Sequence, residues 1–337
     1  MLYVTTRVCQ DAYTAARALS EDRGPAGGFY VPMRSLHFDE QAIASLGERP
    51  FSQNVAQVLN LLFGTNLDGW AVEFGIGRYP VKLVPLTGKI TVAEIWHNPL
   101  WKFERLASGI EKAIRQSDQI GKQTADWLKI ASRIAVLFGI YGQFLKNSTL
   151  SAGQKIDVAV PEDDCAALMA VWYARDWGLP VGTIVCCSHE SNKIWNLLRR
   201  GEMRIDAASK DAIPADLERL ICATLGPEET LRFVRICNTG GTYILQPEQT
   251  ALLRKGIHVS VVSDKRMAST IPNLYNTTGF IADPDAALCY SSLIEYRAAG
   301  GESNQALIMN DESPLYSLQI VSECMNMTPA ELKLLLA

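Results

Sequence analysis

Apolar and polar segments alternate along the chain in a way that predicts strands and helices in turn. Four short apolar runs rich in β-branched residues are typical of strands, at residues 155–160, 182–187, 258–262 and 305–309. Between several of these runs, apolar residues recur at the three- and four-residue spacing of a helix. Strands that alternate with helices in this way predict an α/β fold.

Two long helices stand out in this pattern. Over residues 163–177 apolar side chains recur at helical spacing, and the pattern stops at Gly178 and Pro180. Glycine just past the last turn, with proline soon after it, commonly ends a helix. A second helix, over residues 125–145, is so apolar that we expect it to be largely buried between other elements.

Composition and charge limit the classes of function. The 337 residues are 48% hydrophobic, enough for a globular core in one large or two modest domains. The net charge is −4 with scattered lysines and arginines, which is not the pattern of a nucleic-acid-binding surface. No apolar run reaches the ~20 residues of a membrane span, and Asp11 and Arg17 interrupt the region where a signal peptide is apolar. We expect a cytoplasmic protein that binds neither nucleic acid nor membrane.

The eight cysteines and four histidines predict no metal site. The cysteines lack the paired CxxC spacing of a metal knuckle, and the histidines lie far apart without HxxxH spacing. Most of the cysteines fall inside apolar runs, so we expect reduced, buried thiols.

Six segments spread through the chain match, in order, the motifs of one enzyme family. They are MLYVTTR at residues 1–7, GGFYVP at 27–32, IWHNP at 95–99, GLP at 178–180, LER at 217–219 and ADPDAA at 282–287. Together they resemble the threonine synthase family, and they cover most of the chain. The resemblance implies a tryptophan synthase β-like scaffold of fold type II, whose members bind pyridoxal phosphate (PLP).

The position of the catalytic lysine departs from that family. When the family's lysine motif is laid without gaps on the segment that starts at His97, Glu104 falls where the lysine belongs. A carboxylate cannot form the Schiff base that PLP chemistry needs. Lys102 lies nearby, but an offset of two residues turns a helical side chain by about 200°. We therefore assign the lysine position to Glu104 and keep Lys102 as the alternative.

Two further cofactor positions are also altered. The family's glycine-rich phosphate turn corresponds here to Glu162, Asp163 and Asp164, which lack the glycines that allow a close backbone approach and carry the charge that repels an anion. We expect these acids to cap a helix instead. Asp311 stands where the family has a threonine or serine near the pyridine nitrogen. An aspartate can partner a pyridinium, so this change alone excludes nothing.

The resemblance also implies a shortened architecture. No segment matches the family's substrate loop, so we predict that one sheet domain is reduced or deleted. The predicted parts are an N-terminal module at residues 1–90, a remnant of the lysine helix and a junction at 91–124, and a large α/β domain at 125–337. In the helix after the junction, Asp126, Lys129 and Arg133 stand where the family has asparagine, arginine and glutamine.

These departures lead to three hypotheses. The first is a threonine-synthase-like pseudoenzyme with no cofactor and a binding, scaffolding or regulatory role. The second is a PLP-dependent threonine synthase that converts O-phosphohomoserine to threonine through Lys102. The third is a different enzyme that uses His97 and Glu104, beside Asp164, as an acid–base pair in the remaining cleft.

A deleted domain uncovers surface that it once buried. Trp101, Leu106, Ile110 and Trp127 are the residues expected on that surface. An exposed apolar patch usually has a partner, so we predict a homodimer or a complex with another protein.

Overall fold

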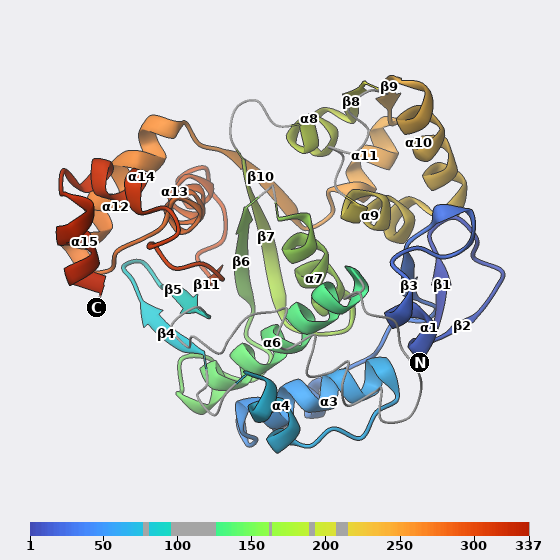
Figure 1. The fold of residues 1–337 in the computed structure, drawn as a ribbon, viewed down its shortest axis with the longest axis horizontal. Helices are drawn as coiled ribbons and strands as arrows, with labels where there is room; N and C mark the ends of the chain where they lie inside the picture. Colours follow the sequence, from blue (N-terminus) through green and yellow to red (C-terminus); the bar gives the residue numbers. More distant parts are fainter. Residues whose placement is uncertain (77–80, 96–125, 162–163, 189–192, 207–214, 337) are drawn as a thin grey trace.

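A six-stranded sheet forms the centre of the protein. The computed structural model describes residues 1–76, 81–95, 126–161, 164–188, 193–206 and 215–336 (Figure 1). The sheet has the order β10-β7-β6-β11-β5-β4, in which all neighbours are parallel except β4 and β5. Its strands are β4 (Lys82–Pro85), β5 (Ile90–Glu94), β6 (Ile156–Pro161), β7 (Val181–Ser188), β10 (Ile257–Val261) and β11 (Gln305–Asn310).

These strands form because the sequence gives them two apolar faces. Along β6, Val158 and Val160 pack into the core on one side of the sheet, and Ala159 packs into the core on the other side. Strands of a parallel sheet covered by helices on both faces show such continuous apolar runs. The α/β fold is therefore confirmed, and each of the four predicted strands lies within one residue of its observed bounds.

Two helices cover one face of the sheet. They are α6 (Asp126–Lys146) and α7 (Cys165–Asp176), and both predicted helices are thus confirmed. The chain needs a glycine just after α7, as predicted. Gly178 has a φ of 105°, and a Cβ at this position would lie 2.4 Å from the carbonyl oxygen of Phe38.

Four helices from the last quarter of the chain build the second core, on the opposite face of the sheet (Figure 1). They are α12 (Asp264–Thr278), α13 (Pro284–Ala298), α14 (Leu318–Met325) and α15 (Pro329–Leu336). The chain leaves β6 toward α7 on the first face and leaves β11 toward α14 on the second. Ligands of open α/β sheets bind where neighbouring strands diverge in this way, at their carboxyl ends.

The N-terminal part adds a small sheet and a set of helices against α6. The sheet has the order β2-β1-β3, and α3 packs along α6. The elements are β1 (Leu2–Thr5), β2 (Tyr13–Thr14), α1 (Ala15–Ser20), η1 (Pro25–Gly27), β3 (Tyr30–Pro32), α2 (Glu40–Ala44), η2 (Ser45–Gly47), α3 (Phe51–Phe63) and α4 (Gly69–Ile76).

A separate lobe lies between β7 and β10 in sequence (Figure 1). It contains a two-stranded sheet, β8-β9, and four helices. The elements are α8 (Lys193–Arg200), β8 (Glu202–Ile205), α9 (Ala215–Leu225), α10 (Pro227–Thr239), β9 (Gly241–Ile244) and α11 (Pro247–Leu253). Within the described ranges there is thus one large sheet, accompanied by sheets of only three and two strands.

The helix α6 is deeply buried. The segment Trp127–Lys146 is long and apolar enough to cross a membrane, yet 78% of its most apolar stretch is buried inside the protein, as in the core helix of a soluble protein. Trp127 is only 1% exposed and packs edge to face with Tyr3 and Tyr173. The expectation that Trp127 lies on an uncovered surface is therefore wrong.

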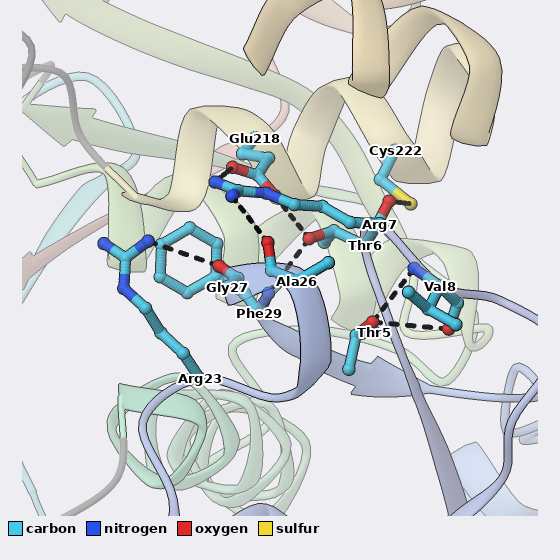
Figure 2. A network of polar contacts seen from close by, with 10 residues as sticks. All are labelled: Thr5, Thr6, Arg7, Val8, Arg23, Ala26, Gly27, Phe29, Glu218 and Cys222. Carbon is cyan, nitrogen blue, oxygen red and sulfur yellow. Dashed lines mark hydrogen bonds and ion pairs between the residues drawn. The ribbon is translucent and has the colours of Figure 1, made fainter. Parts of the chain in front are cut away.

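A polar network ties the N-terminal sheet to α9 (Figure 2). The guanidinium of Arg7 donates two hydrogen bonds to the carboxylate of Glu218, at 2.8 and 3.0 Å. The hydroxyl of Thr6 donates to the same carboxylate and accepts from the backbone N–H of Phe29. The Glu218 side chain is only 6% exposed, so this bidentate ion pair is well shielded from water.

Replacement of Glu218 by glutamine tests this network. The amide keeps the size of the side chain but leaves the guanidinium of Arg7 without its charged acceptor. We expect Glu218→Gln to lower the free energy of unfolding by about 2 kcal/mol in urea titrations. Glu228→Gln, at an exposed position on α10, is the matched control and should change that energy by less than about 0.5 kcal/mol. Equal losses in the two variants would contradict the assigned role of the ion pair.

Candidate functional site

A cavity of about 240 Å³ opens at the carboxyl ends of β6 and β11. It lies at the point where the chain turns from these two neighbouring strands to opposite faces of the sheet, which is the usual place of a ligand in such a fold. Its charged lining consists of one arginine and five carboxyl side chains, namely Arg133, Asp164, Asp283, Asp285, Asp311 and Glu312. The described lining residues include no lysine.

Arg133 joins the two sides of this cavity. It projects from the buried helix α6, and its Nη2 donates to Oδ2 of Asp164 at 3.0 Å and to Oδ2 of Asp311 at 2.9 Å. The three side chains are 14%, 29% and 26% exposed, respectively. We refer to Arg133, Asp164 and Asp311 as the ion triad.

The charges of the ion triad depend on one another. Burial disfavours the charged guanidinium, but the two carboxylates outweigh burial and raise the pKa of Arg133. Burial likewise raises the pKa of Asp311 to about 6, in opposition to the lowering effect of Arg133, while the negative charge of Asp164 adds to the increase. Near neutral pH the triad therefore holds an arginine between two carboxylates.

Asp164 has a second role as the N-cap of α7. Its Oδ1 accepts a hydrogen bond from the backbone N–H of Ala167 at 2.9 Å. A carboxylate at this position interacts favourably with the positive end of the helix dipole and satisfies one of its free N–H groups. The prediction that an acid of this segment caps the helix is thus confirmed for Asp164.

Asp283 forms a third wall of the cavity. It is 4% exposed and caps α13, where its Oδ1 accepts from the backbone N–H groups of Asp285 at 2.8 Å and Ala286 at 3.0 Å. Burial raises the pKa of Asp283, and these hydrogen bonds together with the nearby Asn310 side chain act in the opposite direction. Asp283 was not predicted as a site residue, although an aspartate followed by proline at the first helical position signals a helix start.

Several predicted site residues lie outside the described residues. These are His97, Lys102 and Glu104 of the lysine segment and Glu162 and Asp163 of the phosphate turn. Of the predicted positions, the structure thus brings together Asp164 and Asp311. In the part of the chain that is described, no group of histidine, cysteine and carboxyl side chains is arranged to hold a metal ion.

Comparisons with solved structures show the fold. A threonine synthase from Brucella melitensis, solved with PLP bound, superposes with a TM-score of 0.83 at 14% identity, over 99% of this chain and 94% of that one. The yeast and Escherichia coli threonine synthases give TM-scores of 0.79 and 0.69 at 13% and 12% identity. The superpositions cover 99% and 97% of this chain, and 93% and 92% of the yeast and Escherichia coli chains, respectively. The chain therefore has the fold of the threonine synthases, which is PLP fold type II.

Sequence comparisons point to the same family. The chain is 19% identical over 209 residues to the human protein Threonine synthase-like 1, over 55% of this chain and 28% of that protein. The orangutan protein of the same name, from Pongo abelii, is 20% identical over 174 residues, 48% of this chain and 23% of the relative. The chain thus spans about a quarter of the length of these curated relatives, and it matches no protein-family model. The predicted resemblance to the threonine synthase family is confirmed.

The described residues of the cavity do not fit PLP. The phosphate of the cofactor needs backbone or cationic donors, whereas the N-terminus of α7 is already capped by the carboxylate of Asp164. The one arginine of the lining is already bonded to two carboxylates. An anion would also meet the carboxyl groups that line the cavity, and like charges repel.

The raised pKa of Asp311 predicts a dependence of stability on pH. A carboxyl whose pKa rises from 3.8 to about 6 on folding stabilises the folded state when it is protonated, and this contribution is lost as the pH rises from about 4 to 6. Asp311→Asn keeps a neutral group at all pH values. Relative to this variant, the wild type should lose about 2 kcal/mol of unfolding free energy over that interval. Urea unfolding at pH 4.5 and 7 measures this, and a difference independent of pH would contradict it.

Proposed function

We propose that this protein is a threonine-synthase-like pseudoenzyme that has lost PLP binding and the reaction that depends on it. It keeps the scaffold of the family for a binding, scaffolding or regulatory role. The single observation that supports this proposal most strongly is that one nitrogen atom of Arg133 bonds to both Asp164 and Asp311.

The resemblance assigns a position in the cofactor site to each of these two aspartates. Asp164 belongs to the segment in place of the phosphate turn, and Asp311 stands in place of the residue near the pyridine nitrogen. The phosphate and the ring nitrogen are at opposite ends of the cofactor. Under this assignment, a guanidinium that contacts both positions would lie between them, where the resemblance puts the pyridine ring. The ion triad therefore supplies internally the charge balance that a bound cofactor would bring.

The alternative is a PLP-dependent threonine synthase acting on O-phosphohomoserine. Its support is the fold, since the matched Brucella melitensis structure contains PLP and is covered over nearly its full length. This alternative needs Lys102 as the Schiff-base lysine, with Arg133 and its two carboxylates rearranged to admit an anion. The pseudoenzyme needs neither change, which is why we favour it.

A different enzyme with an acid–base pair in the cleft is a weaker candidate. Its proposed members His97 and Glu104 lie outside the described residues. Asp164, the third member, already accepts hydrogen bonds from Arg133 and from the backbone of Ala167. Both oxygens of this carboxylate are therefore already engaged within the protein.

A role without catalysis requires a partner. We propose a homodimer or a complex with another protein, through the apolar residues Trp101, Leu106 and Ile110, which lie outside the described residues. Light scattering of the purified chain tests the homodimer, and a monomer with these residues shielded by the protein itself would contradict the proposal.

The proposal predicts a colourless protein. A Schiff base between PLP and a lysine absorbs visible light and is trapped irreversibly by borohydride. We expect no visible absorbance after incubation with excess PLP and no borohydride-stable label on Lys102 in peptide mass spectra. The Brucella melitensis threonine synthase, treated in parallel, is the positive control. A yellow preparation whose colour is lost in Lys102→Ala would establish the alternative instead.

A further inference from the structure

Two cysteines meet where the N-terminal sheet contacts α9. Cys9 follows β1 and is exposed, and Cys222 on α9 is half-buried. The thiol of Cys9 donates to the carbonyl oxygen of Thr5 at 3.5 Å, and the thiol of Cys222 donates to that of Thr6 at 3.7 Å (Figure 2 shows the latter contact). The two thiols thus contact the carbonyl oxygens of successive residues, and Cys9 is near enough to Cys222 to contribute to the raised pKa of its thiol.

We propose that Cys9 and Cys222 are a redox-sensitive pair that closes to a disulfide between the N-terminal segment and α9. This site is independent of the fate of the cofactor. Disulfide formation requires the two sulfur atoms to approach to about 2 Å, which calls for a change of side-chain rotamer. The exposed side chain of Cys9 has the freedom to make that change.

Hydrogen peroxide can oxidise the two thiols to a disulfide in two steps. The thiolate of Cys9 attacks one oxygen of hydrogen peroxide, the O–O bond breaks, and one water leaves after proton transfer while Cys9 becomes a sulfenic acid. The sulfur of Cys222 then attacks the Cys9 sulfur and releases a second water as the S–S bond forms. Two thiols lose two electrons to the peroxide, which is reduced to two waters.

The environment assigns a different role to each thiol. Burial raises the pKa of Cys222 to about 12, and the neighbouring Cys9 thiol adds to the effect. Since the thiolate is the reactive form, Cys222 is protected against direct oxidation. Cys9 is the more accessible thiol and meets the peroxide first. Cys222 is the resolving cysteine.

Three other cysteines can be compared with this pair. Cys187 on β7 and Cys289 on α13 also have interacting thiols, but both are buried in the second core and are shielded from an oxidant. Cys237 on α10 lies near Arg7 and Glu218, so it is the competing partner for either thiol, although burial raises its pKa to about 11.

A disulfide at this position affects the helix that borders the ion triad. Asp216, in the first turn of α9, is close enough to Arg133 to raise the pKa of the arginine. Cys222 lies on the same helix, and Glu218 lies between them and holds Arg7. A covalent link at Cys222 therefore fixes α9 against the N-terminal sheet at the end away from the cavity.

Peptide mapping of the full-length chain tests the pair. After treatment with hydrogen peroxide and alkylation of free thiols, we expect a Cys9–Cys222 peptide in most molecules, with Cys187 and Cys289 still reduced. The Tm should rise by roughly 5 °C on oxidation and return after dithiothreitol. Cys9→Ser and Cys222→Ser should abolish both changes, while the matched variant Cys237→Ser should retain them.

Three results would overturn the proposal. They are a disulfide that contains Cys237, oxidation of Cys9 to a sulfinic acid while Cys222 stays reduced, and a Tm rise that persists in Cys9→Ser. Cys9 is exposed, so Cys9→Ser should fold even where Cys222→Ser does not. The reduced state of Cys187 and Cys289 shows that the chain remained folded during the treatment.

Discussion

A helix that is buried on nearly every side must neutralise any charge that it carries, and α6 carries Arg133. Removing an unpaired guanidinium from water costs several kcal/mol, so the fold must bring counter-charges to it. It does so with Asp164, at the start of α7, and Asp311, directly after β11. The same charge therefore constrains where α7 begins and where the chain leaves β11. Two walls of the cavity follow from this requirement.

Four strands of the central sheet and the end of α7 were predictable from the sequence. Strands such as β6 and β11 are buried on both faces, and their continuous apolar runs set their bounds to within a residue. The end of α7 was predictable because Gly178 adopts a conformation that other residues rarely adopt. These are local signals, and each can be read from a few neighbouring residues.

The site itself was only partly predictable. Asp164 and Asp311 were identified one at a time, as departures from a family pattern, but their common partner Arg133 lies 31 and 178 residues away. Long-range pairing of this kind has no local signal. The position of Trp127 was predicted wrongly for a different reason. On a helix that is buried on almost all sides, apolar spacing does not identify a free face, and the side chain packs between Tyr3 and Tyr173.

The ion triad also suggests how this scaffold could lose its cofactor without collapse, under the proposed function. PLP contributes a negative phosphate and a positive ring nitrogen to the two ends of its site, so its loss leaves the surrounding dipoles and charges uncompensated. Asp164 places a carboxylate at the helix N-terminus, where the phosphate was needed, and Arg133 places a cation next to it and to Asp311. Arg133 and one aspartate already form a neutral pair, and the second aspartate extends the contact to the other wall of the cavity.

Helix α9 extends this dependence to the N-terminal sheet. Its first turn carries both Asp216, which contributes to the charge balance of Arg133, and Glu218, which binds Arg7. Both interactions are made by one rigid element. A displacement of α9 that breaks the contact with Arg7 therefore also changes the electrostatic field at the ion triad. The cavity is accordingly sensitive to the N-terminal sheet, even though no residue of that sheet is among its described lining residues.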